Sequence, residues 1–114
     1  MKILITGASG QLGKNLVSCL SRLNHSIILL VRDVNKMEQF LISKDIGNRY
    51  QIYRADITDP IACYKYIRNL DIVIHLAAII QQDENIEKEK EMLNVNFHGT
   101  LNILRAMVAG KVKR

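Results

Sequence analysis

The sequence has few of the features that mark membrane, disulfide-rich or metal-binding proteins. It contains only two cysteines, Cys19 and Cys63, in no recognisable motif, and we interpret both as reduced packing residues of a cytoplasmic protein. The longest apolar runs, 27–31 and 72–80, are far shorter than the roughly 20 residues of a membrane-spanning helix. A signal peptide is not evident, because Met1 leads almost directly into a strand pattern. No His or Cys spacing resembles a zinc site, so we predict no metal.

The charge pattern gives little support for a nucleic-acid partner. The net charge of +5 comes from scattered lysines and arginines and a short basic tail at 111–114. A nucleic-acid surface needs a basic stripe and a recognisable reading element, and the sequence shows neither. We therefore expect no nucleic-acid partner, and the positive charge instead favours a polyanionic cofactor.

Three glycines follow an apolar strand at the start of the chain. The predicted strand covers 3–6, and Gly7, Gly10 and Gly13 lead into a predicted helix that begins at Gln11. This context directs backbone N–H groups and the positive end of a helix dipole at one place, which suits a pyrophosphate. Gly7 would allow a tight turn, Gly10 would let phosphates approach the backbone, and Gly13 would let helix and strand pack closely. The alternative is an ordinary strand-to-helix turn.

Strand and helix patterns alternate along the whole chain. The predicted strands cover 3–6, 27–31, 50–53 and 72–76, and the predicted helices cover 11–23, 34–46, 60–69 and a long segment that follows a polar loop from 81 and ends near 109. Asp59 and Pro60 are typical of a helix start, and Gly110 is typical of a helix end. The alternation predicts an α/β, doubly wound, Rossmann-like parallel sheet with right-handed crossovers, truncated after about four strands and four helices.

Several residues of the last predicted helix are expected to lie on the same side of it. Residues at helical spacing would share that side: Met92, Leu93, Asn96, Gly99, Thr100, Ile103 and Met107. A close approach of this helix to the sheet would explain a glycine in its interior, which otherwise costs about 1 kcal/mol relative to alanine.

Four motifs resemble those of the extended short-chain dehydrogenase/reductase family, the NAD-dependent epimerase/dehydratase type. They are the glycine segment 6–13, an acidic turn at 55–59, a strand end at 71–78 and a helix segment at 96–104. The resemblance covers essentially the whole chain, with the motifs in the family's order and spacing. It implies a doubly wound domain that binds a nicotinamide dinucleotide across the carboxyl ends of its strands. We expect residues 1–114 to be one incomplete dinucleotide-binding domain, the N-terminal half of such a protein without its C-terminal substrate region.

The resemblance also implies a set of cofactor-binding residues. They are Gly7, Ser9, Gly10, Gln11, Leu12, Gly13, Arg32, Asp33, Asp56, Ile57, Leu76, Ala77, Ala78 and Asn96. Asp56 would bond the adenine amino group with Ile57 over the ring, unless it only caps a turn. Ala77 and Ala78 would admit a ribose, or simply pack a strand end. Asn96 would support the active site through the backbone and a water, unless it bonds within its own helix.

The end of the second predicted strand bears on the choice between NAD and NADP. Family members that use NAD carry an acidic residue at this strand tip, where the present chain has Val31 followed by Arg32. A guanidinium at this place suits a 2′-phosphate. Asp33 lies 20 residues beyond Gly13, close to the spacing expected for an acid on the ribose, and keeps NAD open. We favour NADP over NAD.

The chain carries no recognisable proton-transfer group. The family's pair is a tyrosine followed four residues later by lysine, and none of the four tyrosines has that partner. We interpret His75 as a satisfied buried histidine and assign no catalytic residue. The chain is then the NAD(P)-binding N-terminal portion of an oxidoreductase or epimerase/dehydratase-like protein, not catalytically competent alone. The alternatives are a stand-alone regulatory module that binds nicotinamide nucleotide without enzyme activity, and a flavin or other nucleotide binder on the same fold.

The predicted topology also bears on partners. A sheet that stops at its fourth strand exposes an edge. We expect a second copy of the chain or a complementing C-terminal chain to cover it, and we expect no membrane partner.

Overall fold

The computed structural model describes residues 1–80 and 85–114. Within them, β1 (Lys2–Thr6), β2 (Ser26–Val31), β3 (Tyr50–Arg54) and β4 (Ile72–His75) form one sheet in the order β3-β2-β1-β4. All three pairings are parallel. This confirms the predicted α/β class and Rossmann-like arrangement, with the first strand inside the sheet.

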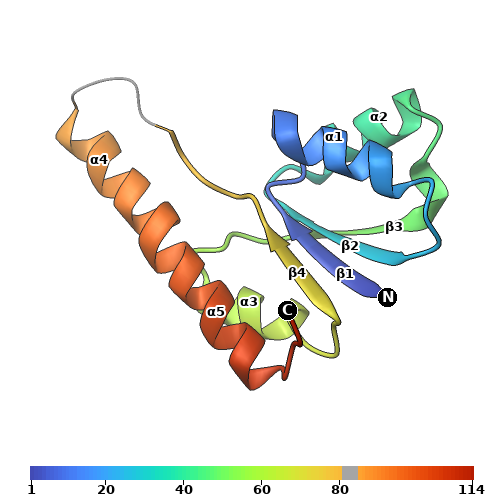
Figure 1. Cartoon of the computed structure of the whole chain (residues 1–114). Coiled ribbons are helices and arrows are strands. Elements are labelled where there is room, and N and C mark those ends of the chain that lie inside the picture. The colour runs from blue at the N-terminus through green and yellow to red at the C-terminus, as the bar shows by residue number, and fades with distance from the viewer. Residues whose placement is uncertain (81–84) are drawn as a thin grey trace.

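Helices cover both faces of the sheet (Figure 1). On one face, α1 (Gln11–Leu20) and α2 (Val34–Ser43) pack over side chains that include Ile3 and Ile5 of β1. On the other, α3 (Pro60–Tyr66) and α5 (Thr100–Ala109) pack over a cluster that includes Leu4. Successive strand residues point to opposite faces. The central strands are therefore apolar throughout because both of their faces are buried.

Aspartate side chains cap the starts of α2 and α3, and the second of these starts was predicted from Asp59 and Pro60. Asp33 caps α2 by accepting a hydrogen bond from the Lys36 amide at 3.0 Å, and Asp59 caps α3 by accepting from Ile61 at 2.9 Å. Pro60 stands in the first turn of α3, as predicted. Such a cap stabilises a helix by about 1 kcal/mol.

Three helices end earlier than the apolar pattern predicts, and the first is α1, which ends at Leu20 instead of near 23. Helix α2 ends at Ser43 instead of near 46, and α3 ends at Tyr66 instead of near 69. Soon after α2 and α3 comes a left-handed residue, Asp45 with φ 54° and Asn69 with φ 55°. Left-handed residues of this kind end helices even where apolar residues continue. A short 3₁₀ turn, Gly47–Arg49, then leads into β3.

The last helix is continuous but contains a π-helical stretch. Helix α4 (Ile86–Leu93) passes through η2 (Asn94–Gly99), a π-helix, into α5. A π turn adds a residue to the repeat, so a face drawn at 3.6-residue spacing does not continue through it. Gly99 and Ile103 are buried as expected, whereas Leu93 is 58% exposed, and the prediction that it shares their face is wrong. The predicted loop begins at Gln81, which lies outside the described residues.

The outer edge of β4 meets the C-terminal residue. The Arg114 amide donates to the Asp71 carbonyl at 3.2 Å, and the Val73 amide donates to the Arg114 carbonyl at 2.8 Å. Lys113 lies beside them and pairs with the Asp71 carboxylate at 2.7 Å. Arg114 therefore pairs with the edge strand as a further strand residue would.

Neither a membrane span nor a metal cluster occurs in the part of the chain that the structure describes. No helix there is long and apolar enough to cross a bilayer. No three His, Cys, Asp or Glu side chains within 1–80 and 85–114 come together in a metal-binding group.

Candidate functional site

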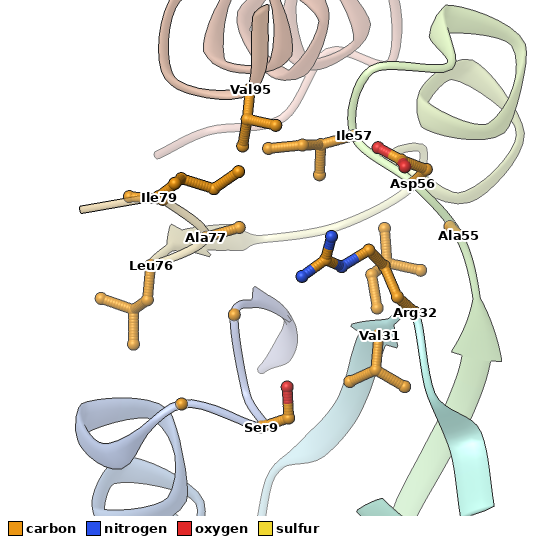
Figure 2. A pocket seen from close by; sticks show the side chains of 14 residues that line it. Ser9, Val31, Arg32, Ala55, Asp56, Ile57, Leu76, Ala77, Ile79 and Val95 are labelled. Atoms are coloured by element: carbon orange, nitrogen blue, oxygen red, sulfur yellow. The ribbon is translucent and has the colours of Figure 1, made fainter. Parts of the chain in front are cut away.

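A cavity of about 240 Å³ opens at the carboxyl ends of the strands. Figure 2 shows side chains from the turns after β1, β2, β3 and β4 and from the long helix converging on it. Many of the predicted residues line it: Gly7, Ser9, Gly10, Arg32, Asp56, Ile57, Leu76, Ala77 and Ala78. Segments far apart in the sequence therefore meet where the doubly wound topology places a ligand.

The other predicted residues do not line this cavity. They are Gln11, Leu12, Gly13, Asp33 and Asn96. Gln11 and Leu12 stand in the first turn of α1, and the side chain of Leu12 is 67% exposed. The main-chain amides of these two residues are candidates for contact with a ligand at the helix start.

The glycine turn is shaped by two close approaches. Gly7 has φ +71°, and a Cβ there would lie 2.5 Å from the Ala77 nitrogen at the end of β4. A Cβ on Gly13 would meet the Gly7 carbonyl oxygen and come within 2.6 Å of the Ala8 Cα. As expected, Gly7 allows a tight turn. Gly13 lets the helix pack closely, although its neighbour is the turn itself and not the strand.

Gly10 has a different environment. A Cβ there would touch only the Gly7 carbonyl oxygen, at 3.3 Å, and Gly10 lines the cavity. It is also the N-cap of α1 and, unlike Asp33 and Asp59, supplies no side-chain cap. The first main-chain bond of α1 runs from Lys14 N to Gly10 O at 2.9 Å, so the amides before Lys14 have no partner within the helix. The turn therefore presents main-chain donors beside an open space.

Asp56 both caps a turn and faces the cavity. Its Oδ1 accepts from the Thr58 amide at 2.9 Å and from the Thr58 hydroxyl at 2.8 Å. The Thr58 amide bond is the main cause that lowers the pKa of Asp56, with smaller contributions from the Thr58 hydroxyl and the charge of Arg32. The carboxylate is therefore ionised at neutral pH. One oxygen is committed to the turn, and the other can accept from a ligand.

The side chains of Arg32 and Asp33 lie in different places after β2. The Arg32 side chain crosses the cavity below Asp56 (Figure 2). Asp33 is directed instead to the start of α2, where it accepts from Lys36. The residue that the sequence placed in competition with Arg32 is thus outside the cavity and engaged as a helix cap.

Asn96 acts on the backbone after β4. Its Oδ1 accepts from the Ile79 amide and its Nδ2 donates to the Ile79 carbonyl, both at 2.8 Å. This is neither a bond within its own helix nor a direct contact with the cavity. The side chain of Ile79 does line the cavity, so Asn96 fixes a wall of the site from behind.

The interior glycine of the long helix also serves the wall of the site. A Cβ on Gly99 would lie 2.7 Å from the Cδ1 of Ile57, a lining residue. The close neighbour is thus a side chain from the turn after β3 and not the sheet, as the sequence suggested. Asn102 adds a bond from its Nδ2 to the Ile57 carbonyl at 3.0 Å.

His75 links three elements behind the cavity. The Thr100 hydroxyl donates to the Asn96 carbonyl at 2.6 Å and so accepts from the His75 Nε2, 3.0 Å away. The Thr6 hydroxyl accepts from the Ala77 amide at 3.3 Å and donates to His75 Nδ1 at 2.6 Å. These directions fit the neutral Nε2–H tautomer, and burial lowers the pKa of His75. The histidine is satisfied as predicted.

Some residues that line the cavity were not predicted from the sequence. They are Leu30, Val31, Ala55, Ile79 and Val95. Leu30, Val31, Ala55 and Ile79 lie within two residues of a predicted site residue at a strand end, so a wider window at each strand end would have found them. Val95 adjoins the predicted Asn96 but lies in the π turn of η2 and not at a strand end.

Comparison with known proteins places this geometry in a family. Residues 3–114 match the family model described as the NAD dependent epimerase/dehydratase family. The chain is 32% identical over 119 residues to a UDP-glucose 4-epimerase from Yersinia enterocolitica, covering 100% of this chain and 35% of that enzyme. The chain therefore spans about a third of the length of that relative.

Solved structures share the fold. An X-ray structure of Pen from Bacillus thuringiensis matches with a TM-score of 0.88 at 24% identity, covering 98% of this chain and 35% of the other. A UDP-glucose-4-epimerase from Stenotrophomonas maltophila, solved with bound NAD and formylated UDP-arabinopyranose, matches with a TM-score of 0.83 at 23% identity, covering 98% and 34%. On the family match over nearly its whole length, the chain belongs to the NAD-dependent epimerase/dehydratase family.

Proposed function

We propose that residues 1–114 are the nicotinamide-dinucleotide-binding portion of an oxidoreductase or epimerase/dehydratase-like protein. The observation that carries this proposal is the uncapped start of α1, where Gly10 lines the cavity and the amides of the next residues, Gln11 and Leu12, have no partner within the helix. A diphosphate is the group that such a helix start attracts. The bound NAD of the Stenotrophomonas epimerase supports a nicotinamide cofactor in particular. The nicotinamide ring would supply hydride transfer, and the chain would bind and orient it.

The cavity walls fit the parts of such a cofactor. The amides of Gln11 and Leu12 would hold the diphosphate, the free oxygen of Asp56 would accept from the adenine amino group, and Ile57 would cover the ring. Ala77 and Ala78 lack bulk at the end of β4, which leaves room for a ribose. The volume of about 240 Å³ is below the roughly 300–1,000 Å³ of most ligand pockets, so these walls enclose part of a dinucleotide.

The same geometry supports NADP over NAD. Arg32 is in the cavity, whereas Asp33 is bonded to the start of α2. An acid that binds both ribose hydroxyls would favour NAD, and a guanidinium beside the ribose suits the extra phosphate.

Catalysis is not part of the proposal for this stretch of chain. None of the tyrosines Tyr50, Tyr53, Tyr64 and Tyr66 is followed four residues later by lysine. This supports a role in cofactor binding and not in proton transfer. His75 has both ring nitrogens engaged by threonine hydroxyls and lies outside the cavity lining.

Calorimetric titration of the purified protein with NADP(H) and NAD(H) tests the proposal. We expect heat of binding from both, with tighter binding of NADP(H). A Gly10→Ala variant should keep the fold but bind about tenfold more weakly, because its methyl group enters the cavity beside the phosphates. Gly47→Ala is the matched control, since a Cβ there meets nothing within 4 Å. No heat from folded protein, or equal affinity in the Gly10→Ala variant, would contradict the proposal.

We further propose that a second copy of the chain covers part of its surface. Along the long helix, large apolar side chains are exposed by half or more: Ile86 70%, Leu93 58%, Phe97 58%, Leu104 52% and Val108 81%. Ile86 and Leu93 lie seven residues apart on α4, and Leu104 and Val108 lie four apart on α5, so each of these helices carries an exposed apolar stripe. Such a stripe favours a helix-to-helix contact between copies over the sheet-edge contact expected from the sequence.

A further inference from the structure

A second cavity lies beside the first and is lined by two arginines. Its lining consists of Arg32, Asp33, Val34, Asn35 and Arg54. Arg32 also lines the larger cavity, so it forms the wall that the two share. The sequence reasoning did not single out Arg54. No hydrogen bond or ion pair engages its guanidinium within the described residues.

The register of β3 explains why Arg54 reaches this place. Tyr50 and Ile52 pack into the cluster under α1 and α2. Arg54 is the next residue on that face, since alternate residues of a strand share a face. It pairs in register with Val31, the residue before Arg32. The end of β3 therefore carries a cation to the same level as the end of β2, beside the start of α2.

The charges in this second cavity decide what it can bind. Arg32 contributes one positive charge and Asp33 one negative charge. Arg54 adds a second positive charge, so the net charge of the lining is positive. The Asp33 side chain stays beside the second cavity because it caps α2, and α2 would lose this cap if the side chain moved away. Without Arg54 the cavity would have no net charge, although a phosphate monoester carries about −1.5 to −2 at neutral pH.

We infer that Arg54 and Arg32 form a subsite for a phosphate monoester, the 2′-phosphate of NADP, and that Arg54 determines the preference for it. This inference rests on the proposed dinucleotide site, because the adenosine ribose must lie against Arg32 for its 2′ position to face the second cavity. Two guanidinium groups can bind the phosphate oxygens by charge-assisted hydrogen bonds. Arg32 suits the phosphate, and Arg54 supplies the excess of positive charge that Asp33 would otherwise cancel.

Affinities of an Arg54→Gln variant for NADP⁺ and NAD⁺ test the inference. Loss of one charge-assisted bond should weaken NADP⁺ binding about tenfold to a hundredfold, while NAD⁺ binding stays within about twofold. Arg54→Lys, which keeps the charge without the planar fork, should fall between wild type and Arg54→Gln. Arg22→Gln is the matched control. It removes the same charge from an exposed residue just after α1, outside both cavities.

The possible outcomes distinguish the role of Arg54 from the proposed dinucleotide site on which it rests. Unchanged NADP⁺ affinity in Arg54→Gln, with binding intact, overturns the role of Arg54 and leaves the dinucleotide site standing. An equal loss of NAD⁺ and NADP⁺ affinity also overturns it, because Arg54 would then not act on the 2′-phosphate. Failure of the wild-type protein to bind either dinucleotide overturns both. Thermal melting of each variant confirms that differences in affinity do not come from unfolding, as expected for an exposed side chain at the end of an edge strand.

Discussion

The three glycines of the first turn are glycines for different reasons. At Gly7 and Gly13 the protein itself leaves no room for a Cβ. At Gly10 the protein leaves nearly enough room, and the cavity lies in front. Gly7 and Gly13 are therefore needed for the fold of the turn, whereas Gly10 leaves room for a ligand.

Replacement of Gly13 by alanine should reduce stability. The new methyl group would collide with the main chain of Gly7 and Ala8, which cannot move aside as a flexible side chain would. Overpacking of this kind costs about 1–3 kcal/mol in the free energy of unfolding. Urea denaturation of Gly13→Ala beside Gly47→Ala measures the effect. Equal midpoints for the two variants would show that the turn relaxes freely.

At the scale of elements, the bonds of His75 connect β1, β4 and α5. Thr6 lies at the end of β1, His75 at the end of β4, and Thr100 at the start of α5. Each hydroxyl donates and accepts in a fixed direction. A proton on His75 Nδ1 would leave the Thr6 hydroxyl facing a second donor.

Stability should therefore decline as the pH falls below about 6.5, the usual pKa of histidine. Burial lowers the pKa of His75 in the folded state, so the unfolded chain binds the proton first. The contribution of His75 is then complete above the unfolded pKa and is lost as the pH falls through the folded one. Urea midpoints between pH 7.5 and 5 should fall more steeply for wild type than for His75→Gln.

His98→Gln serves as the control for this titration, because His98 is exposed on the long helix. It should retain the wild-type slope. The same slope in the His75→Gln and His98→Gln variants would show that His75 is not the titrating group.

Most elements could be predicted from the sequence because their causes are local. Apolar runs predicted the four strands, and Asp59 and Pro60 predicted the start of α3. Helix ends were predicted less well, since the left-handed turns at Asp45 and Asn69 interrupt apolar patterns that continue past them.

The candidate site was likewise predicted in part, where its causes are local. The glycine turn and the residues after β4 lie where their motifs predicted, because strand ends of a parallel sheet share one edge. Local pattern could not reveal the π turn that contains Val95, nor that Ile79 would be the backbone partner of Asn96. Arg54 was missed because its place depends on the register between β2 and β3.

At the scale of the whole molecule, the long helix extends beyond the sheet (Figure 1). Helix α4 has no buried residue, and exposed apolar side chains occur along α4, η2 and α5. If a second copy covers these side chains, Phe97→Glu should yield monomers, because a charge buried in an apolar contact is costly. Sedimentation velocity measures this. Glu91→Gln, on an exposed polar residue of the same helix, should stay dimeric. A monomeric wild type would contradict the proposed contact.

The most direct test of the account is an amide NMR titration of the ¹⁵N-labelled protein with NADPH. The central claim is that main-chain N–H groups at the start of α1 hold the cofactor's diphosphate. We predict that the amide resonances of Gln11 and Leu12 shift strongly on binding, while that of Gly47 stays unchanged. Saturable shifts elsewhere, with the Gln11 and Leu12 resonances unmoved, would place the diphosphate away from the glycine turn and contradict the account.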